Sequence, residues 1–239
     1  MSTAIAGVGV EGIAVRLAAV RQMIGSAAER AGRRPQDVTL IAVSKTFGVA
    51  DIEAAIAAGV TDLGENRVQE AQDKLPMVSG TARWHLIGHL QRNKINKALE
   101  LFDLIHGTDS LDLATAIGHR ADRRGLPART LLQVSVDGNV SQFGFEPDAL
   151  RRSAKEIAVV PGLRLEGLMC IAPHVDDPEE ARPAFQLLAG LAREMEETMR
   201  GSGHPWSHLS MGMSNDYPVA IEEGATLVRV GRAIFGERG

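Results

Sequence analysis

Lys45 is the residue whose place in the chain most directly suggests chemistry. It ends an apolar, β-branched run over 38–45, which is typical of a strand buried on both faces. A lysine at the mouth of such a strand is poorly hydrated, and poor hydration favours its neutral amine. A neutral amine can attack an aldehyde and form a Schiff base. Taken alone, Lys45 is better explained as an ordinary strand-end lysine that reaches for solvent, so other residues must support the chemical interpretation.

Two segments near the C-terminus have the composition of a phosphate-binding cradle. The first contains Ser210, Gly212 and Ser214, and the second ends at Gly231. Glycines permit close backbone approach, and the turn before a predicted helix at 216–223 presents N–H groups to an anion. Serine and glycine also occur in ordinary turns. Opposite a lysine, however, the two segments predict a site for a phosphorylated aldehyde.

Arg229 lies within an apolar, strand-like run over 226–230. A buried arginine needs an acceptor or a partner charge. Glu65 and Asp216 are the candidate partners for a structural ion pair, and a ligand role is equally consistent with the sequence. If the ligand is pyridoxal 5′-phosphate (PLP), an arginine that faces the ring nitrogen keeps it unprotonated and makes the ring a poor electron sink.

Two pairs of histidines are spaced four residues apart, His85 with His89 and His204 with His208. The first pair lies along a strand and its exit, and a proline interrupts the second, so neither is a helical metal-ligand pair. We interpret these residues as structural and expect no metal site. No Gly-x-Ser-x-Gly or Walker-type loop occurs. A racemisation that uses lysine and tyrosine as its two bases would depend on Tyr217, the only tyrosine.

The composition, with 44% hydrophobic and 23% charged residues, is that of a globular protein with a sizeable core. A net charge of −4 gives no general attraction to nucleic acid or to an anionic membrane. The one cysteine, Cys170, lies in an apolar run and is expected to pack as a small hydrophobe. The N-terminus has the pattern of an amphipathic helix rather than a signal peptide. We therefore expect a cytoplasmic protein.

The segments that must position these residues alternate between two patterns. Eight strand-like segments are predicted at 39–45, 62–65, 83–88, 104–108, 129–136, 163–172, 208–211 and 226–231. Helix-like stretches are predicted at 49–59, 67–76, 92–100, 110–125, 147–159, 179–200 and 216–223. Strict alternation predicts a parallel sheet with helical crossovers. Eight units after an N-terminal helix match an α/β fold of the (β/α)8 TIM-barrel type, and a doubly wound open sheet is the alternative.

No linker-like stretch or change in composition divides the chain. We therefore predict a single domain over 1–239, with an N-terminal helix and lead-in over 1–37. In a barrel of this type the active site gathers at the carboxyl ends of the strands. Lys45 and Asn66 follow the first two strands and Arg229 lies in the last, so these side chains are expected to converge on one cavity.

Seven motifs, in this order, resemble those of the pyridoxal phosphate homeostasis protein family. They are AVSKT at 42–46, LGEN at 63–66, WHLIG at 84–88, LQRNK at 90–94, GLM at 167–169, SMGMS at 210–214, and RVG at 229–231 with IFG at 234–236. The match extends from about residue 38 to residue 238. The resemblance implies a single barrel akin to the N-terminal domain of alanine racemase, without the second domain of that enzyme.

The resemblance also implies roles for individual residues. PLP would be held as a Schiff base on Lys45, Arg229 would face the ring nitrogen, and Asn66 would lie beside the ring. The family's phosphate contacts map to five residues of the last two loops, which are Ser210, Met211, Gly212, Gly231 and Arg232. Family members resemble carriers or regulators of B6 vitamer and amino-acid pools that lack robust turnover.

Two positions depart from the family pattern. Arg232 stands where the family often has threonine, so a hydroxyl contact to phosphate is lost, although a guanidinium can substitute for it. Gln142 stands where a lysine usually precedes a glycine. That lysine is linked to a second PLP-handling role, which we do not extend to this chain.

These observations together predict a PLP-binding protein of intracellular PLP and amino-acid homeostasis that is not an enzyme. The alternative is a weak PLP-dependent amino-acid racemase or lyase of the alanine racemase fold type, against which Arg229 and the lack of a second domain both weigh. A PLP-free Schiff-base aldolase would explain Lys45 but would account less well for the paired phosphate loops and Arg229. The expected partners are PLP and PLP-accepting apo-enzymes, with no nucleic acid or membrane partner, and we expect a monomer.

Overall fold

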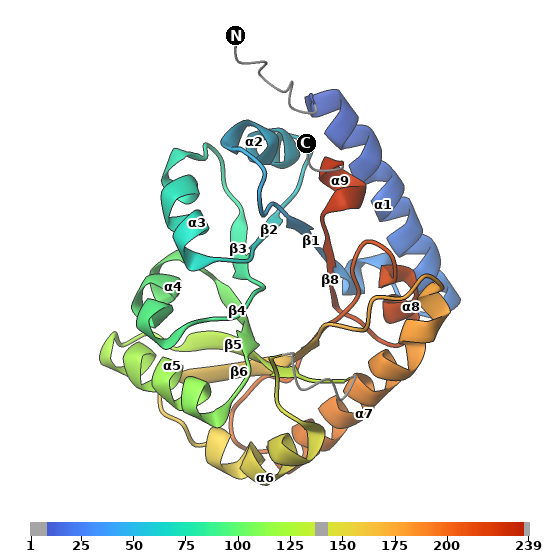
Figure 1. Ribbon diagram of the computed structural model, residues 1–239. Coiled ribbons are helices and arrows are strands. Elements are labelled where there is room, and N and C mark those ends of the chain that lie inside the picture. The colour runs from blue at the N-terminus through green and yellow to red at the C-terminus, as the bar shows by residue number, and fades with distance from the viewer. Residues whose placement is uncertain (1–8, 137–142, 237–239) are drawn as a thin grey trace.

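Eight parallel strands close into a barrel in the computed structural model, which describes residues 9–136 and 143–236 (Figure 1). The strands follow one another in chain order, and the last pairs with the first. They are β1 Thr39–Val43, β2 Asp62–Glu65, β3 Arg83–Leu86, β4 Leu104–Thr108, β5 Ala128–Val134, β6 Leu163–Cys170, β7 His208–Ser210 and β8 Leu227–Val230. The predicted (β/α)8 barrel is confirmed, and the open-sheet alternative is wrong.

Helices cover the outside of the barrel (Figure 1). The α-helices are α1 Val10–Arg30, α2 Val49–Ala57, α3 Val68–Lys74, α4 Ile95–Leu101, α5 Leu111–Arg123, α6 Pro147–Ile157, α7 Arg182–Thr198, α8 Tyr217–Glu222 and α9 Arg232–Phe235. Short 3₁₀ turns lie at η1 Pro35–Asp37, η2 Leu75–Met77, η3 Arg92–Lys94 and η4 Pro178–Ala181. In the two described ranges, no helix is both long and apolar enough to cross a bilayer.

The sequence signals for helix ends have physical counterparts in the structure. Ser110 is the N-cap of α5, and its hydroxyl accepts a hydrogen bond from Leu113 N at 3.2 Å. Gly59 follows α2 with a φ of 92°, a left-handed conformation that favours glycine. Asp109, the residue before Ser110, lies outside the helix, and its carboxylate bonds to His89.

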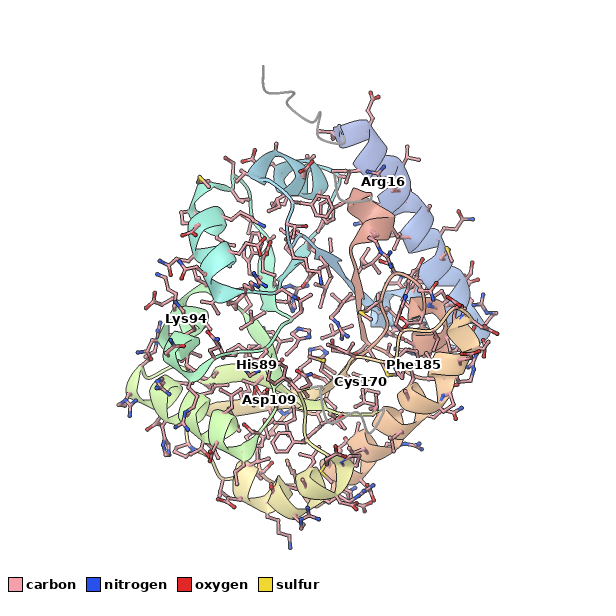
Figure 2. The ribbon with its side chains drawn as sticks, viewed as in Figure 1. Arg16, His89, Lys94, Asp109, Cys170 and Phe185 are labelled. Carbon is pink, nitrogen blue, oxygen red and sulfur yellow. The ribbon has the colours of Figure 1, made fainter. Side chains whose placement is uncertain are left out.

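The N-terminal helix α1 packs along one side of the barrel beside α8 and α9 (Figure 1). Its apolar face is buried, and the Arg16 side chain donates a hydrogen bond from Nε to the carbonyl oxygen of Ile234 at 2.6 Å (Figure 2). This contact joins α1 to α9 near the end of the chain. The extension of a single domain over all of 1–239 stays a prediction.

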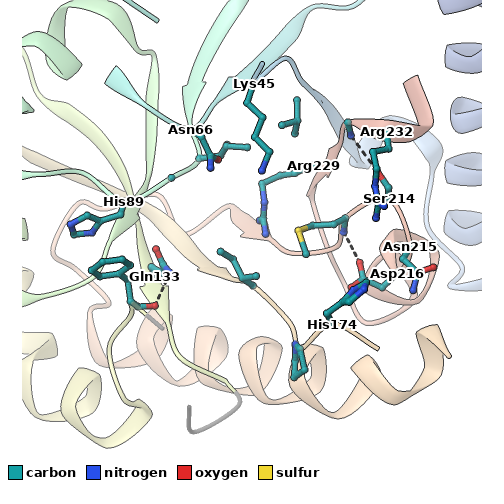
Figure 3. Close-up of a pocket in the computed structure, with 18 of the residues that line it drawn as sticks. Lys45, Asn66, His89, Gln133, His174, Ser214, Asn215, Asp216, Arg229 and Arg232 are labelled. Carbon is teal, nitrogen blue, oxygen red and sulfur yellow. Dashed lines mark hydrogen bonds between the residues drawn. The ribbon is translucent and has the colours of Figure 1, made fainter. Parts of the chain in front are cut away.

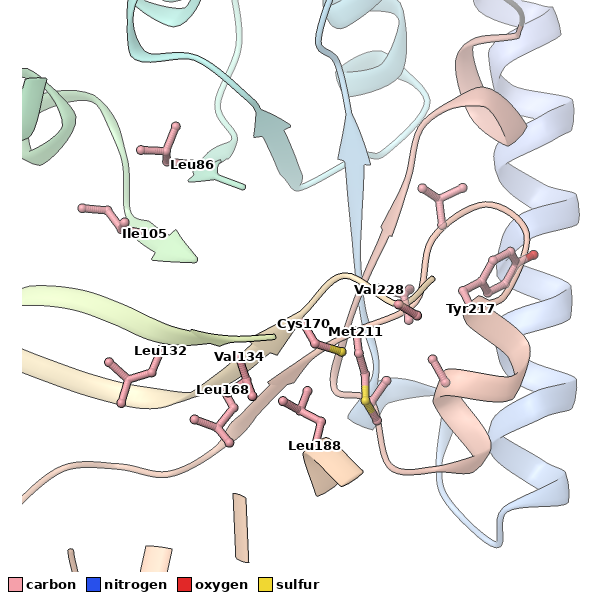
Figure 4. Close-up of a cluster of buried hydrophobic side chains, with 14 of the residues drawn as sticks. Leu86, Ile105, Leu132, Val134, Leu168, Cys170, Leu188, Met211, Tyr217 and Val228 are labelled. Atoms are coloured by element: carbon pink, nitrogen blue, oxygen red, sulfur yellow. The ribbon is translucent and has the colours of Figure 1, made fainter. Parts of the chain in front are cut away.

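Alternation along the strands separates the interior of the barrel from the layer beneath the helices. A cluster drawn from strands alone fills part of the interior and consists of Ile41, Leu104, Leu131, Met169 and Leu227. Residues of the other strand face pack against the helices, among them Cys170, which is completely buried (Figure 4). The expectation that Cys170 packs as a small hydrophobe is confirmed.

Candidate functional site

A cavity of about 820 Å³ opens at the carboxyl ends of the strands (Figure 3). Its wall includes five of the predicted site residues, which are Lys45, Asn66, Arg229, Gly231 and Arg232. They come from the loops after β1 and β2 and from β8 with its exit. The predicted convergence of the first two strand ends with the last strand is therefore confirmed.

Lys45 lies in the turn after β1, two residues beyond the end of the strand. Val43 and Lys45 line the cavity, whereas the intervening Ser44 is buried on the other face and bonds to Glu65. Thr46, the next residue, has a φ of 71°, which is a strained conformation for a β-branched side chain. The chain therefore turns sharply at the point where the lysine enters the cavity.

A buried ion pair holds the backbone on both sides of Lys45. Lys74 Nζ lies 2.9 Å from Glu65 Oε1 and donates to the carbonyl oxygen of Ser44 at 3.2 Å. Glu70 Oε1 lies 3.4 Å from the same amine and accepts a hydrogen bond from Thr46 N at 2.7 Å. Burial raises the pKa of Glu65, and its bonds to Lys74 and Ser44 oppose that rise. The cluster keeps the strained turn in place.

Arg229 is buried in β8, and neutral groups hold its guanidinium. NH1 donates to the carbonyl oxygen and the hydroxyl of Ser210 at 2.8 and 2.6 Å, and NH2 donates to the carbonyl oxygen of Cys170 at 2.7 Å. Burial lowers the pKa of Arg229, while the charge of Asp216 opposes that effect. The considered pairing of Arg229 with Glu65 is wrong, because Glu65 faces α3 and pairs with Lys74. The arginine thus brings a positive charge to the cavity wall.

Asn66 is brought to the cavity by a close approach of two loops. Gly88, which follows β3, passes so near that a Cβ on it would lie 2.3 Å from the carbonyl oxygen of Asn66. A Cβ on Gly107 of β4 would in turn lie 2.5 Å from the carbonyl oxygen of Gly88. Only glycine fits these two positions, and the stacked loops fix the level at which Asn66 meets the cavity.

The predicted phosphate segments contribute unequally to the cavity. Ser214 and Gly231 line it, and Gly231 N donates to Ser214 Oγ at 3.3 Å. Several N–H groups expected to face an anion already have partners, since Met213 N bonds to Asp216 Oδ1 and Tyr217 N bonds to the carbonyl oxygen of Met213. The turn therefore presents fewer N–H groups than the sequence suggests.

Ser210, Met211 and Gly212 lie behind the cavity wall rather than on it. Ser210 is completely buried and supports Arg229, and Met211 packs in the apolar core near Cys170 (Figure 4). Gly212 has a φ of 90°, and a Cβ on it would lie 2.6 Å from that of Ala220 in α8. Their direct contact with phosphate stays a prediction.

Gln133 and Phe143 line the cavity although neither was a predicted site residue, and His89, which follows the third strand and which we interpreted as structural, lines it too. His89 Nδ1 lies 2.8 Å from Asp109 Oδ2 (Figure 2), and the imidazole stacks on Phe143 with ring centroids 3.8 Å apart. Gln133 Nε2 donates to the carbonyl oxygen of Phe143 at 2.7 Å. Strand-end positions after β3, β4 and β5 were a usable signal for these residues, whereas the stacking joins segments far apart in sequence. Gln142 lies outside the described residues.

Comparison with known proteins adds relatives that match along nearly all of this chain. A family described as "Alanine racemase, N-terminal domain" matches residues 15–239. The Pyridoxal phosphate homeostasis protein of Escherichia coli (strain K12) is 40% identical over 235 residues, which cover 95% of this chain and 97% of that protein. Its counterpart from Aquifex aeolicus is 39% identical over 224 residues, or 93% and 97% of the two chains.

A solved structure agrees with these sequence matches. PipY of Synechococcus elongatus PCC7942, with PLP bound, superposes on this chain with a TM-score of 0.82 at 38% sequence identity. The superposition covers 94% of this chain and all of that one. The barrel and its connections are thus shared with a protein whose structure contains PLP.

Proposed function

The chain belongs to the pyridoxal phosphate homeostasis protein family, and from that premise we propose that it binds PLP at the carboxyl ends of its strands. The cofactor is held as a Schiff base on Lys45, and the protein serves PLP and amino-acid homeostasis. The observation that carries the proposal is the meeting of Lys45 and the buried Arg229 in the wall of one cavity.

The groups in that wall suit the chemistry of PLP. When bound, PLP supplies an aldehyde for an amine and a ring that can withdraw electrons. Lys45 would supply the amine, Arg229 would face the ring nitrogen, and Asn66 would lie beside the ring. Ser214, Gly231 and Arg232 would hold the phosphate, because they bring a hydroxyl, a backbone and a guanidinium to the cavity wall. Ser210, Met211 and Gly212 lie behind this wall, and their contact with the phosphate remains part of the proposal.

A carrier function is favoured over a racemase. Arg229 keeps its positive charge at the place where an acid would be needed to protonate the ring. Tyr217, the only tyrosine, is buried in α8, and its hydroxyl lies 3.3 Å from Met23 Sδ of α1, so it is turned away from the cavity (Figure 4). A two-base exchange between this tyrosine and Lys45 therefore has no support. We further propose cytoplasmic localisation, a monomer, and PLP-accepting apo-enzymes as recipients.

The experiment is PLP loading followed by borohydride reduction and peptide mass spectrometry. We expect the added mass on the peptide that contains Lys45, and its loss in Lys45→Ala. Lys97→Ala is the matched control, because Lys97 is a partly exposed residue paired with Glu100 on the outside of the barrel. A wild-type protein that takes up no PLP contradicts the proposal.

A second measurement separates carrier from enzyme. The PLP-loaded protein is incubated with each amino acid in deuterated water, and exchange of the α-proton is followed by NMR. We expect exchange no faster than with PLP alone. Rapid exchange or racemisation that depends on Lys45 would establish the enzyme alternative instead.

A further inference from the structure

A continuous row of hydrogen bonds crosses the interior of the barrel and ends on Arg229. Asp62 Oδ1 lies 3.0 Å from His85 Nε2, and His85 Nδ1 lies 3.0 Å from His106 Nε2. His106 Nδ1 lies 2.9 Å from Ser210 Oγ, which accepts from Arg229 NH1 at 2.6 Å. The five side chains come from β2, β3, β4, β7 and β8, and each is less than 5% exposed.

Such a row is unusual for the interior of this fold, which bulky branched side chains usually fill. A buried polar network stabilises a protein only when each of its members has a partner. The far end is well satisfied, since Asp62 also accepts two hydrogen bonds from Arg83 and one from Thr61. The row is therefore complete from the lower end of the barrel to the cavity.

The chemistry of the two ends fixes the direction of each hydrogen bond between them. Arg229 can only donate, so Ser210 Oγ accepts from it. The buried hydroxyl proton of Ser210 then needs an acceptor, and His106 Nδ1 is the one partner of Ser210 Oγ in the described residues that can accept. An ionised Asp62 can only accept, so His85 Nε2 carries a proton. The bond between the two histidines then requires a proton on His106 Nε2. Both imidazoles are thereby set as neutral rings protonated on Nε2.

The hydrogen bond between His106 and Ser210 affects how Arg229 is held at the cavity. By accepting the Ser210 proton, His106 turns the lone pairs of that oxygen toward Arg229, and hydrogen bonds in such a chain strengthen one another. The guanidinium is then held on two sides, by Ser210 and by the carbonyl oxygen of Cys170. We propose that His106 is a positioning residue for Arg229, which it holds through Ser210 in one orientation toward the cofactor ring.

This inference rests on the proposed PLP site, but its first test does not need PLP. In ¹⁵N-labelled protein without cofactor, the side-chain nitrogens of His106 are followed by two-bond ¹H–¹⁵N correlation, with His106→Asn as the assignment standard. We expect a neutral ring with the proton on Nε2 and Nδ1 unprotonated from pH 8 to pH 6. A proton on Nδ1 in this range overturns the inference.

The second test measures PLP affinity. His106→Leu removes the acceptor for Ser210, and we expect the dissociation constant of PLP to rise about tenfold. His106→Asn restores an acceptor at the position of Nδ1, and we expect affinity within about threefold of wild type. His208→Gln is the matched control, because this β7 histidine contacts Thr226 and lies outside the row. We expect it to bind PLP as wild type does.

The pH dependence of the PLP-loaded protein distinguishes positioning from general support of the fold. In His106→Leu, a loosened guanidinium no longer keeps a proton off the ring nitrogen, so the pH midpoint at which the ring nitrogen of ¹⁵N-labelled PLP takes up a proton, followed by NMR, moves to higher pH. We expect no such movement in His208→Gln. If His106→Leu does not fold, Ser210→Ala takes its place, because it removes the hydroxyl but keeps the carbonyl that holds Arg229 NH1.

The outcomes separate this inference from the proposed function. Equal PLP affinity and equal pH midpoints in wild type and the row variants overturn the role of His106 and leave the PLP site standing. A wild-type protein that takes up no PLP refutes the proposed function. In that case the tautomer measurement, which needs no PLP, still tests whether His106 accepts the Ser210 proton.

Discussion

The amine of Lys74 lies 2.9 Å from Glu65 Oε1, in an ion pair with less than a tenth of either side chain exposed. The same amine donates to the carbonyl oxygen of Ser44, the residue before Lys45. Two charges are seldom buried unless hydrogen bonds satisfy them further. Here the additional bonds go to the backbone that presents Lys45, so the pair couples the stability of α3 to the geometry of the cavity.

We expect Lys74→Met to lower the free energy of unfolding by about 3–5 kcal/mol, because it leaves Glu65 as a buried charge without its partner. Urea denaturation of the protein without PLP measures this loss. The double variant Lys74→Met, Glu65→Leu is expected to recover most of it, because both charges are then absent. Lys97→Met, in an exposed pair, is the control and should stay within ~0.5 kcal/mol of wild type. If Lys74→Met lost as little stability as this control, the ion pair between Lys74 and Glu65 could not be buried as described.

The stability of the fold should fall as the pH is lowered from about 7.5 to about 5.5. Burial lowers the pKa of His106 well below the usual value, and the positive charge of Arg229 acts in the same direction. The unfolded chain takes up a proton on His106 near pH 6.5, whereas the folded chain does not. The unfolded state therefore binds more protons, and one such histidine contributes a slope of at most about 1.4 kcal/mol per pH unit.

Urea denaturation at several pH values checks this slope. His106→Asn should reduce it, because the variant has no proton to take up at this position. His204 and His208, whose pKa values burial also lowers, should leave a remaining slope. His119→Asn is the control at an exposed position of α5. Equal slopes in His106→Asn and wild type would show that His106 titrates alike in both states.

Much of the fold could be predicted because the signal is local. Strict alternation of strand-like and helix-like segments requires parallel strands, and eight units of this size are enough to close a barrel. The strand ends were less predictable: β1 ends at Val43, whereas the apolar run continues to Lys45. Apolar residues beyond the end of a strand can still line the cavity. Hydrophobicity in the sequence therefore does not show where the hydrogen bonding between strands stops.

Site residues could be predicted where their place in a single strand was informative. They could not be predicted where the interaction joins side chains from several strands. Lys45 and Arg229 follow from their places in apolar runs. The acceptors of Arg229 come from β6 and β7, and sequence offered the carboxylate of Glu65 instead. His106 gave no signal, because its partners Ser210 and His85 lie on β7 and β3, and only barrel closure brings the three together.

Cys170 should react with thiol reagents only after the protein unfolds. Burial raises the pKa of its thiol to about 12, and its side chain is completely buried. We expect no reaction with Ellman's reagent in the native protein and one equivalent in denaturant, because the chain has one cysteine. Fast labelling of the native protein would show that β6 opens locally beside Arg229.

The close approach of Gly88 to Asn66 predicts that an alanine at Gly88 destabilises the protein. In Gly88→Ala, the new Cβ would lie 2.3 Å from the carbonyl oxygen of Asn66, so the loops must separate. We expect a loss of about 1–3 kcal/mol in the free energy of unfolding and weaker PLP binding, because Asn66 is displaced. Thermal and urea unfolding measure the first effect, and PLP titration the second.

Gly190→Ala is the matched control for this substitution. Gly190 lies inside α7, and a Cβ on it would meet nothing within 4 Å. Alanine has the higher helix propensity, so this variant should gain up to about 1 kcal/mol and bind PLP unchanged. If Gly88→Ala were as stable as wild type, the loops after β2 and β3 could not be in contact. The position of Asn66 in the cavity would then have to be fixed by contacts other than the one with Gly88.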